Sequence, residues 1–263
     1  MQHVETLWAE LERLEKGGLP YPEGDDGMAP FPGCLMGQGF FPGGDGLWRD
    51  DPKDTNRPPV PIGGILYLGN DFGRVDTFES TLERGHELDS LLTWKYLKKR
   101  IKRAEILNPD VRGELGFYTN AVLGLRKNAE QVTEKNVKTD DPRPWNKPEW
   151  WKERNNFARS CRKFLEFQLE TIQPRLVVIL GPSPRFALCF PKPIITELAI
   201  WEEDKLLKID PRKHIRQGKW KGRGITFLLT NHPRSDSRSK ERCDVEGQVL
   251  AEAWRLATTW SPA

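Results

Sequence analysis

The sequence contains few cysteines, no long apolar run and no large excess of either charge. Four cysteines are spread over 263 residues, and no two of them form a CxxC pair. This spacing argues against a zinc ribbon or an iron–sulfur cluster and is typical of free thiols in a reducing compartment. No stretch approaches the roughly 18 apolar residues that a membrane-spanning helix needs. We therefore expect a cytoplasmic protein that holds no metal and does not contact a membrane.

The formal net charge of +3 is only a mild excess of basic residues. It permits an anionic partner without requiring one, because a nucleic-acid-binding domain usually carries a stronger basic footprint. Hydrophobic residues make up 37% of the chain, and they gather in compact runs. The composition therefore predicts a folded protein and leaves its partner to be identified from motifs.

Residues 1–63 differ in character from the rest of the chain. Apolar residues at helical spacing predict a helix over residues 4–16 that ends before two glycines. These apolar residues are Val4, Leu7, Trp8, Leu11 and Leu14. Residues 20–63 are rich in proline and glycine, which is typical of a long irregular segment. We expect an N-terminal extension over residues 1–63 and a single domain over residues 64–263.

Four short apolar runs after this extension predict buried strands, and helix-like stretches alternate with them. The strands are expected at residues 64–68, 115–119, 176–180 and 225–230, and the helices at 88–106, 148–172 and 247–258. Strands that alternate with helices pair in parallel, with helices on both faces of the sheet. The expected fold is a three-layer α/β/α domain whose central, mostly parallel sheet has four strands.

Polar residues follow the end of each predicted strand. A carboxylate, a carboxamide, a Gly-Pro-Ser turn and an imidazole stand at these positions, in the order Asp71, Asn120, 181–183 and His232. In open parallel sheets, ligands bind beyond the carboxyl ends of the strands. The convergence of four such groups on one edge predicts a functional site there.

Four segments at these strand ends resemble motifs of the uracil-DNA glycosylase superfamily. They are GNDFG at 69–73, FYTNAVLGL at 117–125, LETIQPRLVVILG at 169–181 and TNHPRSDS at 230–237. The chain departs from the family pattern at Phe72, where proline is usual, and at Arg234, where a small residue is usual. Residues 1–63 carry no motif of the family, and the cysteine spacing of its iron–sulfur branch is missing.

This resemblance implies a monofunctional DNA glycosylase that needs no cofactor and leaves an abasic site, since no lysine is marked as a Schiff-base nucleophile. Breaking an N-glycosidic bond builds positive charge on the sugar and negative charge on the departing base. By motif position, Asp71 would orient the attacking water and stabilise the sugar cation. His232 would donate a hydrogen bond to the departing base.

The resemblance also implies a pocket for a flipped base. Asn120 would bind the base edge, and its carboxamide suits uracil in one orientation and cytosine in the other. Asn70 stands where the iron–sulfur branch has a glutamate, and we place it in the pocket. Phe78 is our choice for the ring that stacks on the base, with a core position as its alternative. Gly73 replaces a tyrosine that crowds the pyrimidine 5-position, so a 5-modified pyrimidine, such as hypermodified phage cytosine in antiviral defence, is a candidate substrate besides uracil in DNA repair.

Contacts with double- or single-stranded DNA would offset the cost of flipping the base out of the stack. The turn that contains Gly181 and Ser183 offers backbone donors to a phosphate. The segment that contains Arg234, Ser235 and Arg238 can insert beside the strand or clamp it, although these can also be ordinary surface charges. We expect the protein to act on DNA as a monomer.

Plainer interpretations stand beside these roles. Asp71 can simply cap a turn after a strand, and Asn120 can hold one. The basic run 94–103 can follow a phosphate backbone. More often, such a run is the solvated face of a helix, here with Trp94, Leu97 and Ile101 turned inward.

Two other classes of protein also fit parts of the pattern. A catalytically weak member of the superfamily would bind modified or single-stranded DNA without cutting it. An unrelated α/β nucleotide-binding protein would carry a GxGxxG or GKS pattern after the first strand, and GNDFG lacks both.

Overall fold

A computed structural model gives the fold and describes residues 6–7, 9–10, 13–14, 19–21, 28–30, 62–69, 73, 75, 92–106, 116–126, 148–181, 214–234 and 240–260. These residues form an α/β fold with a five-stranded, mostly parallel sheet. Helices pack on both faces of this sheet.

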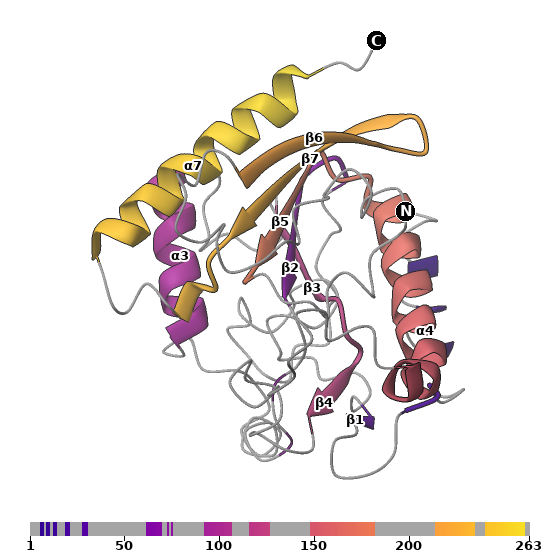
Figure 1. Cartoon of the computed structure of the whole chain (residues 1–263). Helices are drawn as coiled ribbons and strands as arrows, with labels where there is room; N and C mark the ends of the chain where they lie inside the picture. The colour runs from indigo at the N-terminus through magenta and orange to yellow at the C-terminus, as the bar shows by residue number, and fades with distance from the viewer. Residues whose placement is uncertain are drawn as a thin grey trace.

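The central sheet has the strand order β3-β2-β5-β7-β6 (Figure 1). Its strands are β2 (Ile65–Gly69), β3 (Gly116–Asn120), β5 (Leu176–Leu180), β6 (Ile215–Trp220) and β7 (Arg223–Thr230). The first four in this order pair in parallel, so their carboxyl ends lie along one edge. The four predicted strands are confirmed, each with ends within two residues of those expected.

The predicted count of four strands is wrong, because β6 pairs antiparallel with β7 at the side of the sheet. No apolar run marks β6, whose sequence is IRQGKW. As an outer strand it buries only some positions, such as Gly218 and Trp220. The turn that joins it to β7 has positive φ at both Lys221 and Gly222, as in a type I′ hairpin.

Helix α4 (Pro148–Ile172) covers one face of the sheet (Figure 1). Helices α3 (Leu92–Ala104) and α7 (Lys240–Thr259) cover the other face. The three helices predicted after residue 63 are confirmed, with residues 88–91 of the first outside the described part of the chain, but the predicted start of the last one at residue 247 is wrong. Gly247 lies inside α7, where it allows α3 to approach closely. None of the helices described is long and apolar enough to cross a membrane.

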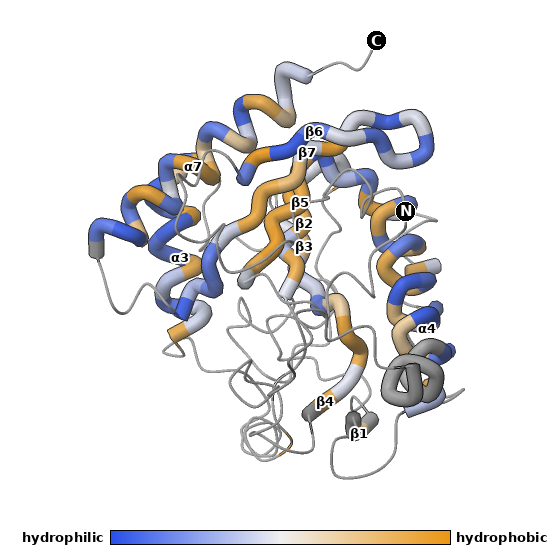
Figure 2. The backbone as a smooth tube through the Cα atoms, viewed as in Figure 1, coloured by the Kyte–Doolittle hydropathy of each residue, from blue (hydrophilic) through white to orange (hydrophobic). Residues whose placement is uncertain are grey.

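Side chains of the central strands alternate between two cores. Ile65 and Tyr67 pack with α3 and α7, whereas Leu66 and Leu68 pack with α4. Successive residues of a strand point to opposite faces, so a strand buried on both faces is apolar throughout. Figure 2 shows this hydrophobic character along β2 and β5 and the more hydrophilic character of β6. Full burial of one such aliphatic side chain contributes about 1.5–3 kcal/mol.

Part of the N-terminal extension packs on the same fold. Leu7, Leu14 and Leu19 are buried in the core beside α4, and the chain is helical at Leu7 and Leu14, as predicted. Strand β1 (Met28–Pro30) pairs antiparallel with β4 (Gly124–Arg126), which follows β3 closely. The division between residues 63 and 64 stays a prediction, but the extension shares its core with the domain.

Candidate active site

The carboxyl ends of the four parallel strands form the edge on which the site was predicted. Asn120, the last residue of β3, pairs with Gly69, the last residue of β2. β5 and β7 also end side by side, at Leu180 and Thr230. Neighbouring strands lie about 4.8 Å apart, so the backbones of β3 and β7 are about 14 Å apart at this edge. Asn120 therefore lies at one side of the edge, and His232, just after β7, lies at the other.

Asn120 is a buried polar residue at this edge. It is 3% exposed, and its Nδ2 has no hydrogen-bond partner among the described residues. The turn after β3 is held by a backbone hydrogen bond, from Ala121 N to Gly69 O at 3.0 Å. A buried donor without a partner costs about 1–3 kcal/mol, so folded proteins keep few of them. An amide in this position is suited to bind a ligand at the sheet edge.

His232 is exposed two residues after the end of β7. Its Nδ1 accepts a hydrogen bond from the backbone N–H of Arg234 at 3.3 Å. A ring nitrogen that accepts a hydrogen bond carries no proton, so this bond favours the neutral tautomer that is protonated on Nε2. The arrangement makes Nε2 a hydrogen-bond donor.

Gly181 packs directly against His232. Its φ is +80°, and an ideal Cβ on it would lie 2.9 Å from Cβ of the histidine and 3.4 Å from its Cδ2. Both the backbone conformation and this contact exclude a side chain. Its N–H donates to Thr230 O at 2.9 Å. The DNA-binding role of Gly181 stays a prediction, but its N–H is already used, and its contact with His232 was not predicted.

A partly buried hydrogen-bond network holds Asn231, the residue before His232. Oε1 of Glu246, from α7, accepts from the backbone N of Asn231 at 3.2 Å and from its Nδ2 at 2.7 Å. Nη1 of Arg100, from α3, donates to Asn231 O at 2.8 Å. Both charged residues are only 2% exposed. The loop that carries His232 is thus fixed from two helices.

Sequence reasoning missed Arg100 and Glu246, although helical spacing contains a signal for each. Arg100 lies three residues after Leu97, and Glu246 lies three residues before Val249, so each shares the buried side of its helix. A charged residue on an apolar stripe is unusual and indicates a buried partner.

Apart from the buried Arg100, the interpretation of residues 94–103 as a helix with a solvated basic face is confirmed. Trp94, Leu97 and Ile101 are buried as predicted. The exposed residues of the same helix include Lys95, Lys99, Lys102 and Arg103.

Two further predicted site residues are described, Gly73 and Arg234. Gly73 has a φ of +91°, and an ideal Cβ on it meets no described atom within 4 Å. A positive φ of this size is one that glycine adopts readily and other residues rarely do. Arg234 is exposed, and its backbone N–H orients the ring of His232. The remaining predicted site residues lie outside the described part of the chain: Asn70, Asp71, Phe78, Ser183, Ser235 and Arg238.

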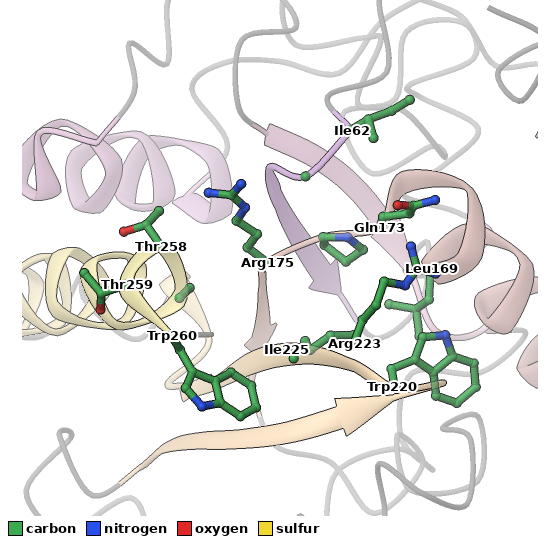
Figure 3. Close-up of a pocket in the computed structure, with 15 residues that line it drawn as sticks. Ile62, Leu169, Gln173, Arg175, Trp220, Arg223, Ile225, Thr258, Thr259 and Trp260 are labelled. Carbon is green, nitrogen blue, oxygen red and sulfur yellow. The ribbon is translucent and has the colours of Figure 1, made fainter. Parts of the chain in front are cut away.

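A cavity of about 650 Å³ lies at the opposite end of the sheet (Figure 3). Arg175, which precedes β5, and Arg223, which begins β7, line it together with Trp220 and Trp260. In Figure 3 the two guanidinium groups point in different directions. None of the predicted site residues lines this cavity.

In the described part of the chain, no three His, Cys, Asp or Glu side chains are grouped so that they could hold a metal ion. Cys161 and Cys243 are buried thiols that form no disulfide. The sequence matches no protein-family model and no curated protein.

Proposed function

We propose that the protein is a monofunctional DNA glycosylase of the uracil-DNA glycosylase type, which hydrolyses the N-glycosidic bond of a flipped pyrimidine and leaves an abasic site. The observation that carries this proposal is the presence of Asn120 and His232 at one edge of the parallel sheet. The first offers a buried amide donor without a partner among the described residues, and the second offers a donor at Nε2.

These two donors suit the two tasks on the base side of the reaction. The amide of Asn120 can pair with the polar edge of a pyrimidine. As the glycosidic bond breaks, its electron pair goes to the base, and a hydrogen bond from His232 Nε2 stabilises the charge on the base oxygen. The neutral tautomer that is protonated on Nε2 is able to donate this hydrogen bond.

Asp71 supplies the carboxylate that the sugar side requires. It follows β2 by two residues in the chain, and β2 lies next to β3 in the sheet. In the proposed reaction it orients a water molecule, whose oxygen bonds to C1′ while its proton passes to the carboxylate. General-base assistance of this kind contributes about a hundredfold or more to a rate.

The base itself is uracil or a 5-modified pyrimidine. Asn120 alone fits both, because its amide can bind in either orientation. The lack of a side chain at Gly73, where the family motif has a tyrosine, supports a substrate with a 5-substituent, as a defence enzyme directed at hypermodified phage DNA would need. Repair of uracil in DNA is the corresponding role if only uracil is released.

Release of free base from defined oligonucleotides tests the proposal. The substrates are duplexes and single strands with one uracil, one mismatched thymine or one glucosylated hydroxymethylcytosine. We expect the wild-type protein to release at least one of these bases, and His232→Ala to slow release about a hundredfold. Arg223→Ala, at the opposite end of the sheet, is the control and should leave the rate unchanged. Tight binding without release of any base would favour a catalytically weak DNA-binding protein instead.

A further inference from the structure

Arg100 and Glu246 lie behind the candidate site and take no part in the proposed chemistry. Burial of a charged group carries a large desolvation penalty unless the group is well bonded. Both residues are 2% exposed, and both bond to Asn231, whereas Oε2 of Glu246 has no hydrogen-bond partner among the described residues. Three polar groups of this one residue, its N, Nδ2 and O, are therefore held by α3 and α7.

The bond from Arg100 also fixes the peptide group that begins His232. Asn231 O and His232 N belong to the same planar unit, so the orientation of the carbonyl determines that of the amide. Glu246 fixes the preceding peptide through Asn231 N. Because both peptide groups are held, the bonds from α3 and α7 determine the position of the His232 Cα.

The crossing of α3 and α7 places the two charged residues where these bonds can form. Gly247 follows Glu246, and an ideal Cβ on it would lie 2.7 Å from the Arg103 Cβ and 3.1 Å from the backbone oxygen of Arg100. The two helices therefore approach closely beside both members of the network. Gly181 packs against His232 from β5 and completes its support.

We propose that Arg100 and Glu246 are positioning residues, which hold the backbone at Asn231 so that the imidazole of His232 keeps its tautomer and its place at the sheet edge. The catalytic consequence of this proposal rests on the proposed function, whereas the effect on the imidazole does not. A misplacement of about 1 Å is enough to lower a catalytic rate about a hundredfold.

Four variants separate positioning from general stability. Glu246→Leu and Arg100→Met remove the polar group and keep most of the side-chain volume, whereas Glu246→Gln and Arg100→Lys keep an acceptor or a donor. Asp244→Asn is the matched control on α7, because it weakens an exposed ion pair with Arg103 at 3.6 Å and leaves the network intact. Asn231→Ala removes only the Nδ2 bond of a partly exposed residue and keeps both backbone bonds, so it should keep the wild-type imidazole shifts.

Two measurements are made on each folded variant. The ¹⁵N chemical shifts of the His232 imidazole report its tautomer in the free protein, and single-turnover base release reports catalysis. We expect Glu246→Leu and Arg100→Met to mix the tautomers and to slow release about tenfold to a hundredfold, with DNA affinity unchanged. Glu246→Gln and Arg100→Lys should recover most of the rate, and Asp244→Asn should match the wild type. In the double variant, the loss of rate should be smaller than the product of the two single losses, because both substitutions act on Asn231.

Unchanged imidazole shifts in whichever removal variant folds would overturn the positioning role. Equal losses of rate in the network variants and in Asp244→Asn would also overturn it. If the wild type releases no base, the proposed function fails, and the imidazole shifts alone decide whether the two residues position His232.

Discussion

At the scale of single residues, Gly181 is the position where a small change should move the imidazole most. We expect Gly181→Ala to slow base release about tenfold or more, because the new Cβ would lie 2.9 Å from the His232 Cβ. Single-turnover kinetics measure this effect. The left-handed backbone at Gly181 should in addition cost about 1–2 kcal/mol of stability.

Gly222→Ala is the matched control for this change. Gly222 has a similar φ of +83°, but an ideal Cβ on it meets no described atom within 4 Å. The control shares the backbone strain and lacks the contact with His232. If both variants lose the same fraction of the rate, strain and not displacement of the imidazole explains the loss.

Tyr67 gives a second prediction, about pH and stability. Burial raises the pKa of the Tyr67 hydroxyl far above its usual range, and burial does the same to the stacked Tyr118. A group with a raised pKa in the folded state stabilises the fold below its unfolded pKa of about 10 and loses this contribution as the pH rises above it. The protein should therefore lose stability steeply above about pH 10.

Tyr67→Phe should reduce this loss by about 1.4 kcal/mol per pH unit above pH 10. At pH 7 we expect at least wild-type stability, because the hydroxyl oxygen has no partner among the described residues. Urea denaturation at pH 7, 10 and 11 provides the measurement. A variant that is clearly less stable at pH 7 would show that the hydroxyl is bonded in solution.

The positions of Asn120 and His232 at the sheet edge could be predicted from the sequence. The contacts that support His232 could not. Asn120 and His232 follow apolar runs that are long enough to mark strands, so their place at one edge follows from parallel pairing. The bond between Arg100 and Asn231 joins residues that are 131 positions apart, and no local pattern contains such information. The contact between Gly181 and His232 likewise depends on the pairing of β5 with β7.

At the scale of elements, the close approach of α3 and α7 is the feature on which the support of His232 depends. Replacing a helical glycine with alanine usually stabilises a helix by about 1 kcal/mol. Gly247→Ala should instead destabilise the fold, because the new Cβ would lie 2.7 Å from the Arg103 Cβ, which is fixed to its backbone. Thermal unfolding measures the change, and a raised Tm would contradict the observed packing.

Elements that are buried on both sides can be identified from a sequence pattern, whereas elements at the side of a sheet cannot. β2 and β5 are buried on both faces, so each is a continuous apolar run that was predicted within one residue. β6 lies at the side of the sheet and is largely polar, so its pairing with β7 is decided by the hairpin turn and not by hydrophobicity. The interior position of Gly247 was missed because a glycine there suggests a helix end.

At the scale of the whole molecule, the N-terminal extension should contribute to stability. Leu7 is fully buried in the core beside α4, and Leu14 and Leu19 share this core. We expect Leu7→Ala to lower the free energy of unfolding by about 2–5 kcal/mol. Urea denaturation of the full chain tests this, and a change below about 0.5 kcal/mol would show that the extension is not anchored in solution.

We propose that the carboxyl edge of the sheet hydrolyses an N-glycosidic bond. The decisive measurement is single-turnover release of free base by the wild type and by Asp71→Asn, at matched DNA occupancy. We expect a free pyrimidine and an abasic site from at least one substrate, with a rate about a hundredfold lower in the variant. Equal rates for the two proteins, or no free base from any substrate, would contradict it.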